Sequence, residues 1–277
     1  MKTVQLPSGE SVPAFGQGTW GMGEKQAARA EEIATLRLGL DRGATLIDTA
    51  EMYGEGKTEE LVGEAIRGRR DGVFLVTKVY PHNATRGGVP AACGRSLRRL
   101  GTDRIDLYLL HWRGKPPLEE TMEAFMVLEE EGKIRHYGVS NLDLADMGEL
   151  WSVKGGRAVA TNQLLYNLSR RGIEWDLLPW LREHHIPVMA YSPIEQARLA
   201  RSRKLADFAR ARGMTAAQAA LAWLLSADDM IVIPKTARRE RLEENLAALE
   251  HPLTKEDLAE LDRLFPPPSG PRSLEML

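Results

Sequence analysis

Four side chains that together could transfer a proton stand at or just after the ends of three apolar runs. Asp48 follows Thr-Leu-Ile, and Tyr53 comes shortly after it. Lys78 follows Val-Phe-Leu-Val-Thr, and His111 follows Leu-Tyr-Leu-Leu. A tyrosine hydroxyl is a poor acid at neutral pH because its ordinary pKa is about 10. A nearby ammonium stabilises the phenolate and lowers that pKa, and a carboxylate keeps the ammonium charged and in place.

This set of side chains suits the reduction of a carbonyl by a hydride donor. That reaction needs an acid to protonate the developing alkoxide and donors that stabilise it. Tyr53 is the candidate acid, and a neutral His111 could orient the carbonyl. Each residue alone has a simpler explanation, because an Asp often caps a helix, a Lys reaches solvent and a His is often a satisfied, half-buried side chain. Their joint occurrence at consecutive strand ends favours the catalytic interpretation.

The elements that would position these residues alternate along the whole chain. Short runs rich in Val and Ile predict strands at Phe15–Trp20, Thr45–Asp48, Val73–Lys78, Ile105–His111, Ile134–Ser140, Ala160–Leu165, Val188–Tyr191 and Ile231–Pro234. Helical periodicity predicts helices at Gln26–Arg42, Thr58–Arg67, Pro90–Leu100, Leu118–Glu131, Ala145–Trp151, Trp175–His184, Thr215–Ser226 and Arg239–Leu249. Such alternation predicts parallel strands joined by helical crossovers. Repeated at this length, it favours an α/β protein with a closed (β/α)₈ TIM barrel, whose chemistry lies at the C-terminal ends of the strands.

Two further elements are expected outside the barrel. Val4–Leu6 and Val12 flank Pro7-Ser8-Gly9, which predicts an N-terminal β-hairpin that plugs the barrel bottom. Leu253–Leu264 predicts an added C-terminal helix, and the tail from about residue 266, which starts with three prolines, is expected to be loosely held. No linker divides the chain, so residues 1–277 are expected to form a single domain.

Composition and charge exclude several function classes. Lys and Arg number 37 against 39 Asp and Glu, for a net charge of −2, which gives no case for binding nucleic acid or a membrane surface. Cys93 is the single cysteine and is expected to be buried, so no internal disulfide can form. We expect no signal peptide, no membrane span and a cytoplasmic location. Glu183-His184-His185 lacks the spacing of a metal site, so no metal is expected.

At the residues proposed for catalysis, the sequence resembles the aldo-keto reductase family. The stretch Leu46–Tyr53 is similar to that family's sequence around its catalytic Asp and Tyr, while Thr77-Lys78 and Leu109–Trp112 match its Lys and His positions. The resemblance runs from Gly16 to about Asn245. It implies that the catalytic residues are Asp48, Tyr53, Lys78 and His111.

The resemblance also implies a nicotinamide cofactor held by the later strands. Ser140, Asn141 and Gln163 match the residues that hold the nicotinamide carboxamide, and Tyr191 matches the aromatic that stacks on its ring. Other positions match residues along the rest of the cofactor: Gly18, Thr19 and Trp20 against it, and Ser192 and Pro193 at the start of the loop across the pyrophosphate. Ile194–Arg198 departs from the Gly-rich start that the family often has in this loop.

A basic cluster near the end of the barrel indicates which nicotinamide cofactor is used. Lys235, Thr236 and Arg241 match the family's residues on the 2′-phosphate of NADPH, and Glu244 and Asn245 match those on the adenine. Fixed positive charge at a helix start suits an additional phosphate. The alternative is a solvated basic helix face.

A competing pattern lies in Gly16-Gln17-Gly18-Thr19-Trp20-Gly21, which fits the G-x-G-x-x-G outline of a doubly wound dinucleotide-binding fold. The following helical pattern starts only near Lys25, which is too late for Gly21 to lie at its N-terminus. Too many strand–helix units are also present for that fold, so the barrel remains the better interpretation.

Three aromatic residues, Trp20, Tyr80 and Trp112, follow strand ends and are expected to surround the substrate carbonyl. Tyr80 could equally be packing at the barrel rim. Short mouth loops and a short tail predict an open site for small aldehydes and α-dicarbonyls. The overall pattern is similar to bacterial methylglyoxal reductases and to 2,5-diketo-D-gluconate reductase-like members of the family, which implies a monomer.

Two other functions remain as alternatives. Lys78 could form a Schiff base in a lyase or isomerase on the same barrel. The chain could also be a nucleotide-binding regulatory subunit with little turnover.

Overall fold

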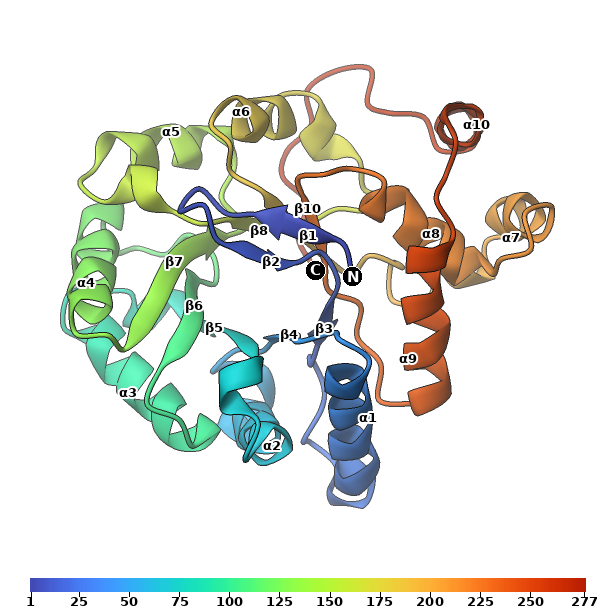
Figure 1. Cartoon of the computed structure of the whole chain (residues 1–277). Helices are drawn as coiled ribbons and strands as arrows, with labels where there is room; N and C mark the ends of the chain where they lie inside the picture. The colour runs from blue at the N-terminus through green and yellow to red at the C-terminus, as the bar shows by residue number, and fades with distance from the viewer.

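Eight parallel strands form the wall of a barrel in a computed structural model that describes residues 1–277 (Figure 1). The strands are β3 (Gly16–Gly18), β4 (Leu46–Asp48), β5 (Phe74–Val79), β6 (Ile105–Leu110), β7 (Ile134–Ser140), β8 (Asn162–Leu165), β9 (Val188–Tyr191) and β10 (Met230–Val232). Each pairs with the next along the chain. Parallel bridges from Phe15 to Val232 and from Gly18 to Lys235 join the first strand to the last. The predicted (β/α)₈ barrel is therefore confirmed.

The paired glycines of β3 allow this closure, which explains the G-x-G pattern without a dinucleotide fold. A Cβ at Gly18 would lie 2.8 Å from the carbonyl oxygen of Ile233, and one at Gly16 would lie 2.5 Å from a Leu46 methyl group. The Gly18 amide donates to the Pro234 carbonyl at 3.0 Å, where the first strand meets the segment after the last. Only a residue without a side chain fits so close an approach.

Helices surround the barrel. They are α1 (Arg29–Asp41), α2 (Lys57–Ile66), α3 (Gly88–Leu100), α4 (Leu118–Glu130), α5 (Leu144–Ser152), α6 (Leu177–Glu183), α7 (Arg203–Arg210), α8 (Ala216–Leu225), α9 (Arg239–Leu246) and α10 (Lys255–Leu264). The helices before the last strand, β10, connect the barrel strands, and α9 and α10 follow it. A capping box begins α8, where Thr215 and Gln218 bond each other's backbone amides. Helix α7 was not predicted, although its buried Leu205, Phe208 and Ala209 have helical spacing.

The predicted hairpin and added helix are both present. Strands β1 (Thr3–Gln5) and β2 (Ser11–Pro13) pair antiparallel, and their Val4 and Val12 are buried. Figure 1 shows this hairpin crossing one end of the barrel and α10 outside the ring of crossover helices.

The end of the chain differs from the expected loose tail. Figure 1 shows it leaving α10 and returning to the barrel axis, where the chain ends. Arg171 donates to the Phe265 carbonyl, Glu275 pairs with Arg170, and Leu274 packs against the core. The three prolines after Phe265 end the helix but favour stiff, extended backbone rather than disorder, so the tail can reach these partners.

Candidate active site

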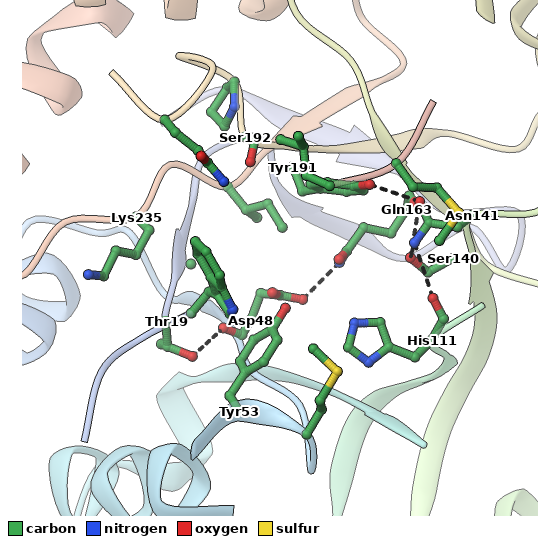
Figure 2. Close-up of a pocket in the computed structure, with 18 of the residues that line it drawn as sticks. Thr19, Asp48, Tyr53, His111, Ser140, Asn141, Gln163, Tyr191, Ser192 and Lys235 are labelled. Atoms are coloured by element: carbon green, nitrogen blue, oxygen red, sulfur yellow. Dashed lines mark hydrogen bonds between the residues drawn. The ribbon is translucent and has the colours of Figure 1, made fainter. Parts of the chain in front are cut away.

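A cavity of about 750 Å³ opens at the C-terminal ends of the barrel strands, in the range typical of small-molecule sites. Figure 2 shows Tyr53 and His111 in its lower half, and Tyr191 and Ser192 in its upper half. Most residues predicted from the sequence to form the site line it: Gly18, Thr19, Trp20, Asp48, Tyr53, His111, Trp112, Ser140, Asn141, Gln163, Tyr191, Ser192, Pro193 and Lys235. Residues from distant parts of the chain therefore meet here.

Lys78 lies beneath the cavity floor and joins two of the candidate catalytic residues. It is the penultimate residue of β5 and is fully buried. Its ammonium lies 2.9 Å from the Asp48 carboxylate and donates to the Tyr53 hydroxyl at 3.2 Å. A third bond runs to the Thr49 carbonyl at 2.8 Å. The ammonium is therefore fixed in position by three acceptors.

The ionisation of this pair follows from burial and charge together. Burial disfavours the Lys78 ammonium, but the attraction of Asp48 and of Tyr53 outweighs it and raises the lysine's pKa above its ordinary value. Burial also raises the pKa of Tyr53, with Lys78 opposing and Asp48 adding to the rise. The expected net lowering of the tyrosine pKa is therefore wrong, because burial, together with the Asp48 charge, outweighs the opposing effect of the Lys78 ammonium.

His111 is neutral across the working pH range. Burial, with the nearby Lys78 charge, lowers the pKa of its imidazole to about 2. The ring meets Tyr53 edge-on with centroids 5.8 Å apart. Its Nδ1 is buried without a hydrogen-bond partner, so the chain itself does not fix the tautomer. A neutral imidazole here can donate to or accept from a bound oxygen.

Two contacts on Asp48 were not expected from the sequence. Gln163 donates from Nε2 to Asp48 Oδ1 at 2.8 Å, and the Thr19 hydroxyl donates to the Asp48 carbonyl at 2.8 Å (Figure 2). Gln163 comes from β8 and Thr19 follows β3, so sequence spacing could not have paired them with β4. Gln163 orients the carboxylate that holds Lys78, and Thr19 fixes the Asp48 backbone.

Amide and hydroxyl groups line the wall formed by β7 to β9. Asn141 donates to the Ser140 hydroxyl at 3.1 Å and to the His111 carbonyl at 3.2 Å, and accepts from the Tyr191 hydroxyl at 3.0 Å. Gln163 also borders the cavity. This donor and acceptor set, beside the Tyr191 ring, fits a planar carboxamide on an aromatic heterocycle.

The segment that follows β9 has unusual backbone geometry. Ser192 and the three residues Glu195, Gln196 and Ala197 all have positive φ, at 48°, 49°, 50° and 69°. Left-handed backbone costs a non-glycine residue about 1–2 kcal/mol. The fold therefore holds a strained segment beside the cavity, where the sequence departs from the family's Gly-rich loop start.

The basic cluster at the far end is only partly joined to the cavity. Lys235 lines it, whereas Thr236 and the α9 residues lie outside its lining. Arg241 is exposed and paired with Glu244, and Asn245 is buried. A cationic group at Lys235, with further arginines on α9, fits an anionic end of a long ligand.

Only two of the three predicted aromatic residues line the cavity. Trp20, which is 56% exposed, and Trp112 line the cavity. Tyr80 does not line it and instead packs edge-on against Trp112 at 5.7 Å, so the rim-packing alternative describes it better. Met276 and Leu277 of the tail complete the lining, which corrects the expectation of a mouth left open by a short tail.

Other groups carry no comparable chemistry. Cys93 is buried, and burial raises the pKa of its thiol to about 12. No group of three or more His, Cys, Asp or Glu side chains could hold a metal ion. None of the helices combines the length and apolar character needed to cross a membrane.

Comparisons with known proteins agree with this geometry. The model of the aldo/keto reductase family matches residues 14–265. The methylglyoxal reductase YeaE of Escherichia coli is 51% identical over 283 residues, covering 100% of this chain and 99% of that protein. Crystal structures of an aldo/keto reductase from Klebsiella pneumoniae, one in complex with NADP and acetate and one with NADPH, are each 53% identical with a TM-score of 0.97. Each of these alignments covers 100% of this chain and 99% of the Klebsiella chain.

Proposed function

Because this chain belongs to the aldo/keto reductase family, we propose that it is an NADPH-dependent oxidoreductase that reduces small aldehydes and α-dicarbonyls, of the methylglyoxal type, to alcohols. The cofactor assignment is supported by similar structures that bind NADP and NADPH. The substrate class is supported by the similar methylglyoxal reductase. NADPH supplies the hydride when it is bound; the chain supplies position, charge and a proton.

One observation carries the proposal: a buried ammonium bonded at once to a carboxylate and to a tyrosine hydroxyl beside the cavity. Tyr53 donates its proton to the carbonyl oxygen as negative charge develops there. The Lys78 ammonium stabilises the phenolate that remains, and Asp48 keeps that ammonium in place. Neutral His111 orients the carbonyl oxygen without competing as an acid, because its pKa of about 2 leaves it unprotonated.

The proposed cofactor site extends from β7 to α9. Ser140, Asn141 and Gln163 would hold the carboxamide, with the Tyr191 ring against the nicotinamide. Gly18, Thr19 and Trp20 would border the cofactor, and Ser192 and Pro193 would start the segment over the pyrophosphate. The remaining proposed contacts are with the 2′-phosphate and adenine, from Lys235, Thr236, Arg241, Glu244 and Asn245. The cavity lining at Lys235 supports this direction of binding.

The cavity also supports a small substrate. Trp20 and Trp112 give apolar walls near Tyr53, and Met276 and Leu277 close part of the opening. Apolar walls around a few convergent polar groups suit a compact carbonyl compound.

We further propose that residues 1–277 act as one domain, as a monomer and in the cytoplasm. One chain provides every proposed catalytic group, so no second copy is needed to complete the site. Its single, buried cysteine suits a reducing compartment.

The test is NADPH oxidation, followed by absorbance, with methylglyoxal and with benzaldehyde as substrates. Turnover of methylglyoxal that depends on the protein, with alcohol product identified by mass spectrometry, supports the proposal. Tight NADPH binding with no turnover of either substrate would instead support the regulatory alternative.

The lyase alternative conflicts with the state of Lys78. A Schiff base needs a neutral amine, but the paired, buried lysine has its pKa raised. Borohydride should therefore trap no substrate on Lys78, and a mass increase at that residue would favour the lyase.

A further inference from the structure

Two parts of the cavity wall come from outside the barrel strands. One is the segment 192–198, which we call the clamp segment, and the other is the chain end 272–277, which we call the tail. Ile194, Gln196 and Ala197 of the first line the cavity together with Met276 and Leu277 of the second. The two walls therefore enclose the same space, although they lie far apart in sequence.

The clamp segment is anchored by a buried carboxylate. Glu195 is 2% exposed and accepts from Arg170 Nε at 2.9 Å and from Asn167 at 2.7 Å. Arg198 adds a third bond at 2.8 Å, and the same Asn167 amide donates to the Ser192 carbonyl at 3.0 Å. A buried carboxylate with this many donors is well compensated.

These bonds offset an unfavourable backbone. Glu195, Gln196 and Ala197 form a run of left-handed residues, each non-glycine. Such a run persists only where its surroundings over-determine it. Loss of the Glu195 contacts would therefore allow the segment to relax to other conformations.

The same arginine also holds the tail. Arg170 Nη1 donates to the Glu275 carboxylate, and Glu275 directly precedes the two cavity-lining residues. Arg170 itself is half-buried, with 26% of its side chain exposed. Its planar guanidinium can address two carboxylates at once through different nitrogens, which an ammonium on a flexible stem does poorly.

We propose that Arg170 is a positioning residue that couples the clamp segment to the tail, so that cofactor capture and the shape of the substrate pocket change together. The proposal rests on the proposed function in taking the clamp segment to lie over the cofactor. Arg170 does not line the cavity. Its effect passes through Glu195 on one side and Glu275 on the other.

The direct test is backbone hydrogen exchange by mass spectrometry, with and without NADP⁺. In the wild type, NADP⁺ should slow exchange in peptides from both the clamp segment and the tail. In Arg170→Met, NADP⁺ should slow exchange in the clamp segment only, because the link to the tail is gone. Arg170→Lys should restore part of the tail protection.

Two variants separate the contact of Arg170 with the tail from its contact with the clamp segment. Glu275→Gln should remove the tail protection while NADPH affinity stays within about twofold of wild type. Arg170→Met should weaken NADPH binding about three- to tenfold and raise the KM for methylglyoxal by a similar factor, with kcat changed less. Arg182→Met is the matched control, because Arg182 pairs with Asp229 away from the cavity. It should leave both readouts unchanged.

The inference is overturned if NADP⁺ protects the tail equally in wild type and in both Arg170→Met and Glu275→Gln, or does not protect it in wild type. Should Arg170→Met fail to fold, Glu275→Gln decides alone. These results do not depend on turnover. If the wild-type protein binds NADP⁺ and shows slower exchange in the tail but reduces no carbonyl, the proposed function is contradicted and the proposed coupling still stands.

Discussion

The two sides of the barrel mouth are built differently. On the side of β4, β5 and β6, the candidate proton donor rests on fully buried partners, with Lys78 held by three acceptors. On the opposite side, after β9 and β10, the wall consists of a strained loop and the end of the chain. Lys235 on this side is exposed, and the buried Glu195 holds the backbone of the clamp segment rather than a proton donor.

This contrast separates chemistry from ligand entry. The proton donor needs an environment that does not reorganise during the reaction, and burial in the barrel provides it. A large cofactor must enter and leave, so its side requires elements that can open. Variants on the first side should therefore change kcat, and variants on the second should change affinity.

The largest expected effect is that of Lys78→Met. It removes the charge that stabilises the Tyr53 phenolate, so kcat should fall by about 10²–10⁴-fold. It also leaves Asp48 buried without its ion pair, which should lower the free energy of unfolding by about 3–5 kcal/mol. Single-turnover kinetics and urea denaturation measure the two effects. Lys255→Met, on exposed α10, is the control, and an equal loss of activity in it would contradict the assignment.

Lys235→Ala should act on affinity instead. Loss of one charge-assisted contact to a phosphate should weaken NADPH binding about tenfold or more, while NADH binding changes little. Fluorescence titration with both cofactors tests this, with Lys133→Ala at the other end of the barrel as control. An equal loss for both cofactors would show that Lys235 does not contact the 2′-phosphate.

Trp20→Ala should have a smaller effect on the substrate. Removing an apolar wall weakens ground-state and transition-state binding alike, so the KM for methylglyoxal should rise a few-fold, about threefold to tenfold, with kcat little changed. Trp175→Ala is a control of similar exposure outside the cavity. A kcat loss as large as that of Lys78→Met would place Trp20 with the catalytic residues.

The smallest effect should be that of pH on the reduction. Tyr53 must be protonated to act, and its pKa is raised, so no loss is expected until the pH exceeds about 10. His111 stays neutral because its pKa is about 2. The rate at saturating substrate should change by less than about twofold between about pH 6 and pH 9. A fall with an apparent pKa near 7 would mean that one of these assignments is wrong.

The sequence was most informative for the proton-donor side. Asp48, Lys78 and His111 lie at or next to the C-terminal ends of consecutive apolar strands, and strand order alone brings these ends together. The fold could be predicted for the same reason, since alternation and periodicity are local signals. Family resemblance then added the cofactor residues, most of which line the cavity.

The rest depended on long-range contacts that no local pattern encodes. The bond from Gln163 to Asp48 crosses the barrel, and Glu195 is buried only because Asn167 and Arg170 meet it. The net rise in the Tyr53 pKa likewise depends on how burial and two opposite charges balance. The residue types could identify these groups, but they could not predict which effect on the pKa would be larger.

The measurement that tests the central claim most directly is single-turnover reduction of methylglyoxal by Tyr53→Phe with NADPH bound. We expect a rate lower by about 10²–10⁴-fold, with NADPH affinity within about twofold of wild type. Tyr108→Phe, which removes a buried hydroxyl without a partner, should react at the wild-type rate. Equal rates in Tyr53→Phe and wild type would contradict the claim that Tyr53 supplies the proton.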